Sequence, residues 1–337
     1  MIDLPQIWFV LIGVLLVGYA VLDGFDLGVG MLSPILGRTS AQRGLLVETI
    51  GPVWDGNEVW LLALGGALFA AFPIVYATVF SGFYLALMLL LFALILRAVS
   101  IEFRNHVEDA RWLRFWDGAF WLGSFLPALL LGVAIGNIAR GLPLTGGEYT
   151  QGLLGLLNPF SLGVGLLAVA MFAMQGASWL VLRTEGELAA SARRVGRLAW
   201  VCFVVLWLVV TALALIDAPD LWANYGNLLA WLAPLVFVAA LAVTGYALWS
   251  RHERLPILGS SLSIAALVAI LGQALYPALV PDRTAGADLT ITNAAASNLS
   301  LSVMLVITLI GVPIVLVYTG FVYSRFTHKV SLEEPAS

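Results

Sequence analysis

Long uncharged stretches constrain the fold of this chain more than any other feature of its sequence. Short clusters of charged residues separate apolar runs of about 20 residues or more, the length that a helix needs to cross a bilayer. Nine such spans are predicted, with the approximate limits 6–30, 49–71, 75–99, 115–139, 158–182, 198–216, 224–249, 257–280 and 300–325. Only 11% of the residues are charged, against about a quarter in soluble domains. The sequence therefore predicts an all-α integral membrane protein, and it has no basic patch of the kind that binds nucleic acid.

Basic residues gather in every second segment between the predicted spans, and so on one side of the membrane. If the N-terminus lies outside, the inner segments hold Arg38, Arg43, Arg104, Arg111, Arg114, Arg183, Arg193, Arg194, Arg197, Arg251, Arg254, Arg325 and Lys329. The outer loops then hold only Arg140 and Arg283, together with several acidic residues. Such a bias follows the positive-inside rule. It predicts an odd number of spans, an N-terminus outside and a cytoplasmic C-terminus.

The order of the spans suggests an internal duplication. Residues 25–30 (FDLGVG) on the first span resemble residues 160–165 (FSLGVG) on the fifth. This spacing fits two four-helix bundles plus one extra helix, with pseudo-repeat halves at about 1–140 and 158–280 and the extra helix at 300–325. No low-complexity linker separates the halves, so we predict a single polytopic domain over residues 1–337.

Ionisable residues inside the spans point most directly to function, because placing a charge in a bilayer is costly. Asp23 and Asp26 on the first span are three residues apart and so share one helix face. The second span carries three more acids whose spacings of seven and three also predict one face, namely Glu48, Asp55 and Glu58. Both sets fall in the cytoplasmic half of the predicted bundle. Arg97, late on the third span, returns to that depth, where it could balance one of the carboxylates.

Two interpretations of these carboxylates remain open. In a low-dielectric site, carboxyl groups can exchange protons near neutral pH, which favours a proton-conducting or ion-binding cluster open to the cytoplasm, with Asp26 and Asp55 as its leading members. Alternatively, the acids pair with Arg97 and hold the bundle together. Trp54, next to Asp55, could stack on a quinone ring or could anchor the helix at the membrane interface.

Histidine positions bear on cofactor binding. The three histidines, His106, His252 and His328, fall in predicted cytoplasmic loops or in the C-terminal tail. A haem in the bilayer needs an axial ligand at membrane depth, usually histidine. We therefore expect this chain to bind no haem by itself. The single cysteine, Cys202, lies in an apolar run and is expected to pack there without binding metal.

Several motifs together resemble subunit II of cytochrome bd-type quinol oxidases. They occupy residues 22–32, 51–61, 65–73, 80–84, 132–137, 157–160 and 175–177. The resemblance extends over nearly the whole chain and is densest before residue 190. The sequence differs from some members of that family in carrying Glu58 where a neutral glutamine can stand.

The resemblance implies a haem-free subunit of a respiratory heterodimer in the cytoplasmic membrane of a bacterium or archaeon. Its partner, subunit I, would hold haems b and d, or b only, and the quinol site, and some complexes would add a small single-helix accessory subunit. This chain would stabilise the partner and contribute to proton uptake from the cytoplasm. By position in the motifs, Asp26 and Asp55 would be the acids of that path and Arg97 its basic residue, with Asp23 and Glu58 beside them.

The resemblance also implies that Trp54 occupies the position that contacts a structural quinone in some members. Two other functions are weighed against the oxidase subunit. A proton-coupled secondary transporter would also use membrane carboxylates, and it would be active without a haem-bearing partner. A purely structural membrane subunit would use its acids only for pairing.

Overall fold

The computed structural model describes residues 3–284, 286–326 and 328–330. In chain order the elements are α1 (Leu4–Leu36), α2 (Ser40–Glu48), α3 (Trp54–Ala71), α4 (Pro73–Gly82), α5 (Tyr84–Phe103), η1 (Arg104–His106), α6 (Ala110–Arg140), β1 (Leu144–Thr145), β2 (Glu148–Tyr149), α7 (Gly152–Gly155), α8 (Pro159–Arg183), α9 (Gly186–Asp217), η2 (Pro219–Tyr225), η3 (Leu228–Trp231), α10 (Leu232–Trp249), α11 (Leu255–Leu275), β3 (Ala278–Val280), β4 (Leu289–Thr290) and α12 (Asn298–Arg325). Each pair of strands forms a short antiparallel hairpin, β1 with β2 and β3 with β4. The prediction of an all-α protein is confirmed.

Eight of the described helices are long and apolar enough to cross a membrane. They are α1, α5 continued by η1, α6, α8, α9, α10 preceded by η3, α11 and α12. The remaining predicted span, 49–71, corresponds to α3, an 18-residue helix whose first turns carry Asp55 and Glu58. The count of about nine spans therefore agrees with the structure once α3 is included, and the chain is an integral membrane protein.

Several predicted limits were wrong, and backbone geometry explains the largest error. The span predicted at 49–71 begins only at Trp54, because residues 49–53, which include Gly51 and Pro52, form a turn after α2. Pro73 then starts α4, where a proline needs no amide donor. The other differences are the break at Phe83 between α4 and α5, the 3₁₀ turns of η2 and η3 at the start of 224–249, and the strand β3 at the end of 257–280.

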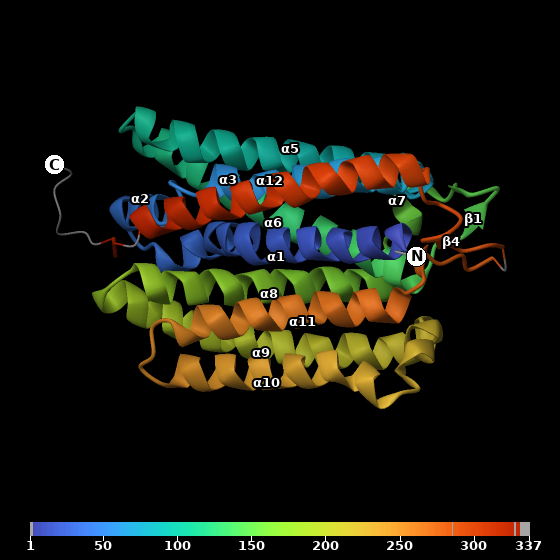
Figure 1. The fold of residues 1–337 in the computed structure, drawn as a ribbon. Coiled ribbons are helices and arrows are strands. Elements are labelled where there is room, and N and C mark those ends of the chain that lie inside the picture. Colours follow the sequence, from blue (N-terminus) through green and yellow to red (C-terminus); the bar gives the residue numbers. More distant parts are fainter. Residues whose placement is uncertain (1–2, 285, 327, 331–337) are drawn as a thin grey trace.

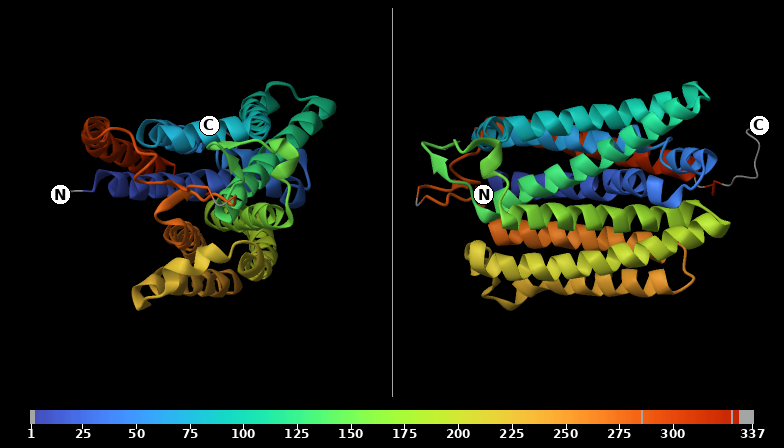
Figure 2. Two further views of the ribbon diagram at one scale, coloured as in Figure 1. Left: turned by 90° about the vertical axis from the view of Figure 1, so that its right-hand side faces the viewer. Right: turned by 180° about the vertical axis from the view of Figure 1, so that it is seen from behind.

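The long helices lie side by side in two groups, as Figure 1 and Figure 2 show. The first group contains α1, α3, α5 and α6, and the second contains α8, α9, α10 and α11. Helix α12 packs beside α1 and α3. The start of α1 and both hairpins lie at one end of the bundle, and α2 lies at the other end (Figure 1). The predicted arrangement of two four-helix bundles plus one extra helix is confirmed.

The two groups meet along α8, which packs against both α6 and α1. At the crossing of α1 with α8 the two backbones come close together. Gly28 and Gly176 face each other there, and a Cβ atom added to Gly28 would lie 2.0 Å from the carbonyl oxygen of Phe172 and 2.7 Å from the Cα atom of Gly176. Small residues allow membrane helices to approach this closely. Phe25 stacks on Trp179 nearby, with ring centroids 4.1 Å apart. This crossing directs one face of α1 toward α8 and leaves Asp23 and Asp26 on another face.

Polar contacts join the two groups at both ends of the bundle. At the end that carries the hairpins, Arg140 of α6 donates two hydrogen bonds to Asp217 of α9, and Arg283 donates to the same carboxylate. At the opposite end, Lys329 donates to Glu253 between α10 and α11 at 2.9 Å. That hydrogen bond holds the pKa of the Glu253 carboxyl below its ordinary value. The segment after α12 thus contacts the second group, although α12 itself packs on the first.

The six-residue internal similarity occupies different positions along its two helices. Residues 25–30 lie late in α1, whereas residues 160–165 form the first turns of α8. The similarity therefore does not align the two helices in depth. The pseudo-repeat halves and the single domain over residues 1–337 stay predictions, and residues 1–2, 285, 327 and 331–337 lie outside the described chain.

Candidate functional site

A buried cluster of charged side chains lies between α1, α3 and α5. The Arg97 Nη2 atom is 2.6 Å from Asp23 Oδ1 and 3.3 Å from Glu58 Oε2. The side chains of Arg97 and Asp23 have no exposed surface, and that of Glu58 is 21% exposed. Asp26, one turn along α1, is also fully buried. Four of the predicted site residues therefore come together.

Glycines on α1 and α6 explain how the cluster forms. Gly24 packs against the ring of Phe172 on α8, so the opposite face of α1 carries Asp23 and Asp26 toward α3. On the other side, a Cβ atom on Gly123 of α6 would lie 2.7 Å from the backbone nitrogen of Arg97. Because α5 and α6 pack this closely, the Arg97 side chain has room only toward α1 and α3.

Two uncharged residues that the sequence analysis missed complete the cluster. Asn57 Nδ2 donates to Asp26 Oδ2 at 2.8 Å, and the Tyr323 hydroxyl donates to Asn57 Oδ1 at 2.7 Å. Asn57 is 1% exposed and lies between Asp55 and Glu58, so a search for buried polar side chains, not only charged ones, would have found it. Tyr323 is 266 residues away on α12, and no local signal in the sequence marks it.

The cluster contains more acid than base. Asp23 and Glu58 pair with the single guanidinium of Arg97, and Asp26 is a third buried acid whose hydrogen bond comes from Asn57. Within the described part of the chain, five buried polar atoms there have no hydrogen-bond partner: Tyr19 Oη, Asp23 Oδ2, Asp26 Oδ1, Arg97 Nε and Arg97 Nη1. A buried negative charge without a counter-charge is costly, and a bound proton removes it. Chemically, this group of side chains can hold an exchangeable proton.

The other predicted acids lie outside this cluster. Asp55 is exposed on the outer face of α3, one turn before Glu58. Glu48 is the last residue of α2, so the prediction that it shares a helix face with Asp55 was wrong, because the turn at 49–53 separates the two helices. Trp54 is half-buried and packs beside the apolar cluster that contains Phe25. Its contact with a quinone stays a prediction.

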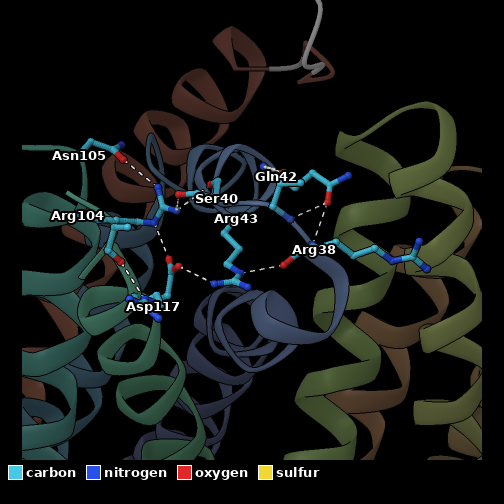
Figure 3. A network of polar contacts seen from close by, with 11 residues as sticks. Arg38, Ser40, Gln42, Arg43, Arg104, Asn105 and Asp117 are labelled. Carbon is cyan, nitrogen blue, oxygen red and sulfur yellow. Dashed lines mark hydrogen bonds and ion pairs between the residues drawn. The ribbon is translucent and has the colours of Figure 1, made fainter. Parts of the chain in front are cut away.

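A second polar network fixes α2 at the end of the bundle (Figure 3). Asp117 of α6 accepts a hydrogen bond from Arg104 at 2.7 Å and another from Arg43 at 2.9 Å. Arg104 also donates to the carbonyl and the hydroxyl of Ser40, while Gln42 accepts from the backbone of Arg38. The network ties the α1–α3 connection to α5 and α6, and thereby holds the beginning of α3 in place.

Neutralising the acid of this network should loosen α2. We expect Asp117→Asn to lower the free energy of unfolding by about 1–3 kcal/mol, because both guanidinium groups lose a charged acceptor. The thermal midpoint of the purified protein in mild detergent measures the change. Glu108→Gln is the matched control, since Glu108 is exposed in the nearby loop. Equal midpoints for the two variants would contradict the structural role of Asp117.

The three histidine side chains are candidate ligands for a cofactor, because histidine is the usual axial ligand of haem. His106 ends η1 and His252 lies in the loop between α10 and α11. His328 follows α12 and is exposed. These three side chains therefore lie at the ends of the bundle and not at the depth of the buried cluster. Among the described residues, no group of three or more His, Cys, Asp or Glu side chains is arranged to hold a metal ion.

An apolar cavity of about 910 Å³ lies between the two helix groups. Its lining includes Leu64, Trp207, Tyr225 and Leu267, together with Tyr19 of α1. The Tyr19 hydroxyl is buried and has no hydrogen-bond partner in the described chain. The lining is almost entirely apolar, and Trp54 does not contribute to it.

Comparisons with known proteins agree with one another. The family described as cytochrome bd terminal oxidase subunit II matches residues 4–326. Cytochrome bd-I ubiquinol oxidase subunit 2 of Escherichia coli K12 is 37% identical, over 97% of this chain and 95% of that protein. Cytochrome bd ubiquinol oxidase subunit 2 of Bacillus subtilis is 33% identical, over 99% of both chains. A chain of the bd oxidase structure from Geobacillus thermodenitrificans superposes with a TM-score of 0.80 at 16% identity, covering 96% of this chain and 99% of that chain.

Proposed function

The chain belongs to the cytochrome bd terminal oxidase subunit II family, and from this premise we propose that it is the haem-free subunit of a quinol:dioxygen oxidoreductase. In this role it stabilises a haem-bearing subunit I and contributes to proton uptake from the cytoplasm. Haems b and d, or b only, belong to the partner, which carries the electron transfer from quinol to dioxygen. The complex lies in the cytoplasmic membrane, with the α2 end of this chain toward the cytoplasm.

The observation that carries the proton-uptake proposal is the buried cluster of three carboxyl groups around Arg97. Asp26 lies ten residues before the end of α1 at Leu36, or about 15 Å from it at 1.5 Å per residue. Protons consumed at the dioxygen site must cross part of the membrane field, and each such charge is worth about 2.3 kcal/mol per 100 mV. A chain of proton-holding groups is therefore needed, and the cluster supplies one segment of it.

The outer face of α3 is the proposed contact with subunit I. Exposed residues follow one another along this face at helical spacing, namely Asp55, Val59, Leu62, Gly66 and Phe69. A carboxylate on a lipid-facing surface is unfavourable, whereas a protein partner can offer it a polar side chain or enclosed water. In this proposal Asp55 continues the proton path at the subunit interface, with Trp54 beside it. The apolar cavity next to Tyr19 would accommodate a structural quinone or a lipid chain.

Two other functions make different predictions. A proton-coupled transporter would work without a haem-bearing partner, and the full-length similarity to oxidase subunits disfavours it. A purely structural subunit would use Asp23, Glu58 and Arg97 only as ion pairs. The two unpartnered oxygens, Asp23 Oδ2 and Asp26 Oδ1, favour proton transfer over this structural function, because a group that only pairs would be expected to satisfy both oxygens.

Asp26→Asn in the purified oxidase complex tests the proposed function. We expect quinol-dependent oxygen uptake per haem to fall about tenfold or more, because an amide cannot pass on a proton, while haem content stays unchanged. Asp220→Asn removes the same charge at an exposed position of η2 and should leave both quantities unchanged. Lower haem content with unchanged turnover per haem would instead support a structural role and overturn the proton path.

A further inference from the structure

Helix α12 is attached to the rest of the bundle near its two ends. Near its start, the Trp8 indole nitrogen donates to the carbonyl oxygen of Leu301 at 3.1 Å. At its other end, Arg183 donates to the carbonyl oxygen of Phe326, and Tyr323 lies edge-on to Trp179 with centroids 6.1 Å apart. Most side chains between these ends are exposed. The contacts near the end of α12 therefore set where the Tyr323 hydroxyl points.

The hydroxyl of Tyr323 holds the amide of Asn57 in place from the side opposite Asp26. The amide nitrogen of Asn57 lies 3.4 Å from the carbonyl oxygen of Leu22 and 2.8 Å from Asp26 Oδ2. A backbone carbonyl can only accept a hydrogen bond, so the nitrogen must be on that side. The amide oxygen then faces Tyr323 and accepts its hydroxyl proton at 2.7 Å. Without that donor, the buried amide oxygen of Asn57 would lose its hydrogen-bond partner, and only the contacts of the amide nitrogen to Leu22 and Asp26 would hold the side chain.

The orientation of Asn57 has a consequence for Asp26. Because an N–H group occupies Oδ2, this oxygen accepts a hydrogen bond whether the carboxyl group is charged or neutral. The hydrogen bond to Oδ2 favours protonation of Asp26 on Oδ1, which is buried and has no hydrogen-bond partner among the described residues. The other charged or titratable groups around it are Asp23 on α1, Glu58 on α3 and Arg97 on α5.

We propose that Tyr323 is a positioning residue for proton transfer, which acts through Asn57 and fixes Oδ1 as the oxygen of Asp26 that carries the proton. This inference rests on the proposed function, since it assigns a role to α12 within the same proton path. If Tyr323 were absent, the unpartnered amide oxygen would let Asn57 shift away from Asp26, and the hydrogen bond to Oδ2 would weaken. Tyr323 keeps that N–H group on Oδ2, so the proton stays on the oxygen that faces away from Asn57.

Infrared difference spectroscopy of the purified oxidase complex across a pH titration tests this inference. In the unmodified complex, the protonated Asp26 group should give a carbonyl band at lowered wavenumber, because its C=O oxygen accepts from Asn57. Loss of the band in Asp26→Asn assigns it. In Tyr323→Phe, we expect this band to change its wavenumber and turnover per haem to fall roughly three- to tenfold, the effect of one hydrogen bond.

A matched control and a second variant separate positioning from packing. Tyr318→Phe removes a hydroxyl from the same helix at a side chain that is 66% exposed, and it should leave band and turnover unchanged. Asn57→Leu should move the band to higher wavenumber, because it removes the N–H donor and leaves the carbonyl group free. An Asp26 band that is identical in Tyr323→Phe and the unmodified complex, or no Asp26 band at any pH, would overturn the inference.

The outcomes distinguish this inference from the proposed function. If Asp26→Asn keeps full turnover, the proton path itself fails, whatever Tyr323 does. If Asp26→Asn loses turnover but Tyr323→Phe leaves the band in place, the path stands and only the positioning role of Tyr323 fails.

Discussion

Arg97→Met is expected to give the largest loss of stability of any single substitution in the buried cluster. It leaves Asp23 and Glu58 without the guanidinium that lies 2.6 Å and 3.3 Å from them. Removing one partner of a buried ion pair costs about 3–5 kcal/mol, because the remaining charge is left uncompensated. We expect little folded complex in the membrane and a much lower thermal midpoint. The yield of complex in size-exclusion chromatography of the detergent extract measures the first effect.

A control variant and a double variant test whether the loss of stability comes from the buried ion pair. Arg114→Met removes an exposed arginine near the same end of the bundle and should leave the yield unchanged. Combining Arg97→Met with Asp23→Asn leaves only the partly exposed Glu58 without a counter-charge, which costs less than leaving the fully buried Asp23 uncompensated as well. The double variant should therefore recover folded complex without recovering turnover. A normal yield and midpoint for Arg97→Met alone would show that the ion pair contributes little to stability.

Gly28→Ala is expected to weaken the packing between the two helix groups, although it adds only one methyl group. The new Cβ atom would lie 2.0 Å from the carbonyl oxygen of Phe172 and 2.7 Å from the Cα atom of Gly176. Both neighbours are backbone atoms, so a change of side-chain rotamer cannot relieve the clash. Overpacking of this kind costs about 1–3 kcal/mol and occasionally more. We expect the upper end of that range, because α1 and α8 must move apart along their whole contact.

Gly13→Ala provides the matched control on the same helix. No neighbouring atom lies within 4 Å of a Cβ atom at Gly13, and alanine favours a helix by up to about 1 kcal/mol over glycine. Its thermal midpoint should be unchanged or slightly raised, whereas that of Gly28→Ala should fall clearly. Equal midpoints for the two variants would mean that the close crossing of α1 and α8 does not hold the groups together.

The sequence predicted which charged residues enter the membrane but not all of their neighbours. Asp23, Asp26, Glu58 and Arg97 were identified because charges are rare in apolar spans, and the structure brings these four together. Asp55 was expected among them and lies on the exposed face of α3. The 3.6-residue period shows that two residues share a helix face, but not whether that face turns toward the bundle.

The sequence by itself determined the class of the protein, its number of spans and its family, because span length and the cost of buried charge are local properties that need no knowledge of neighbouring helices. The motifs and their order along the chain were likewise sufficient to identify the family. Only the tertiary structure decided that Tyr323 reaches Asn57 across 266 residues and that Asp117 joins Arg43 and Arg104. These contacts depend on which helices pack together. That packing is set by shape complementarity between helices, such as the crossing at Gly28, and the sequence of one span alone does not show it.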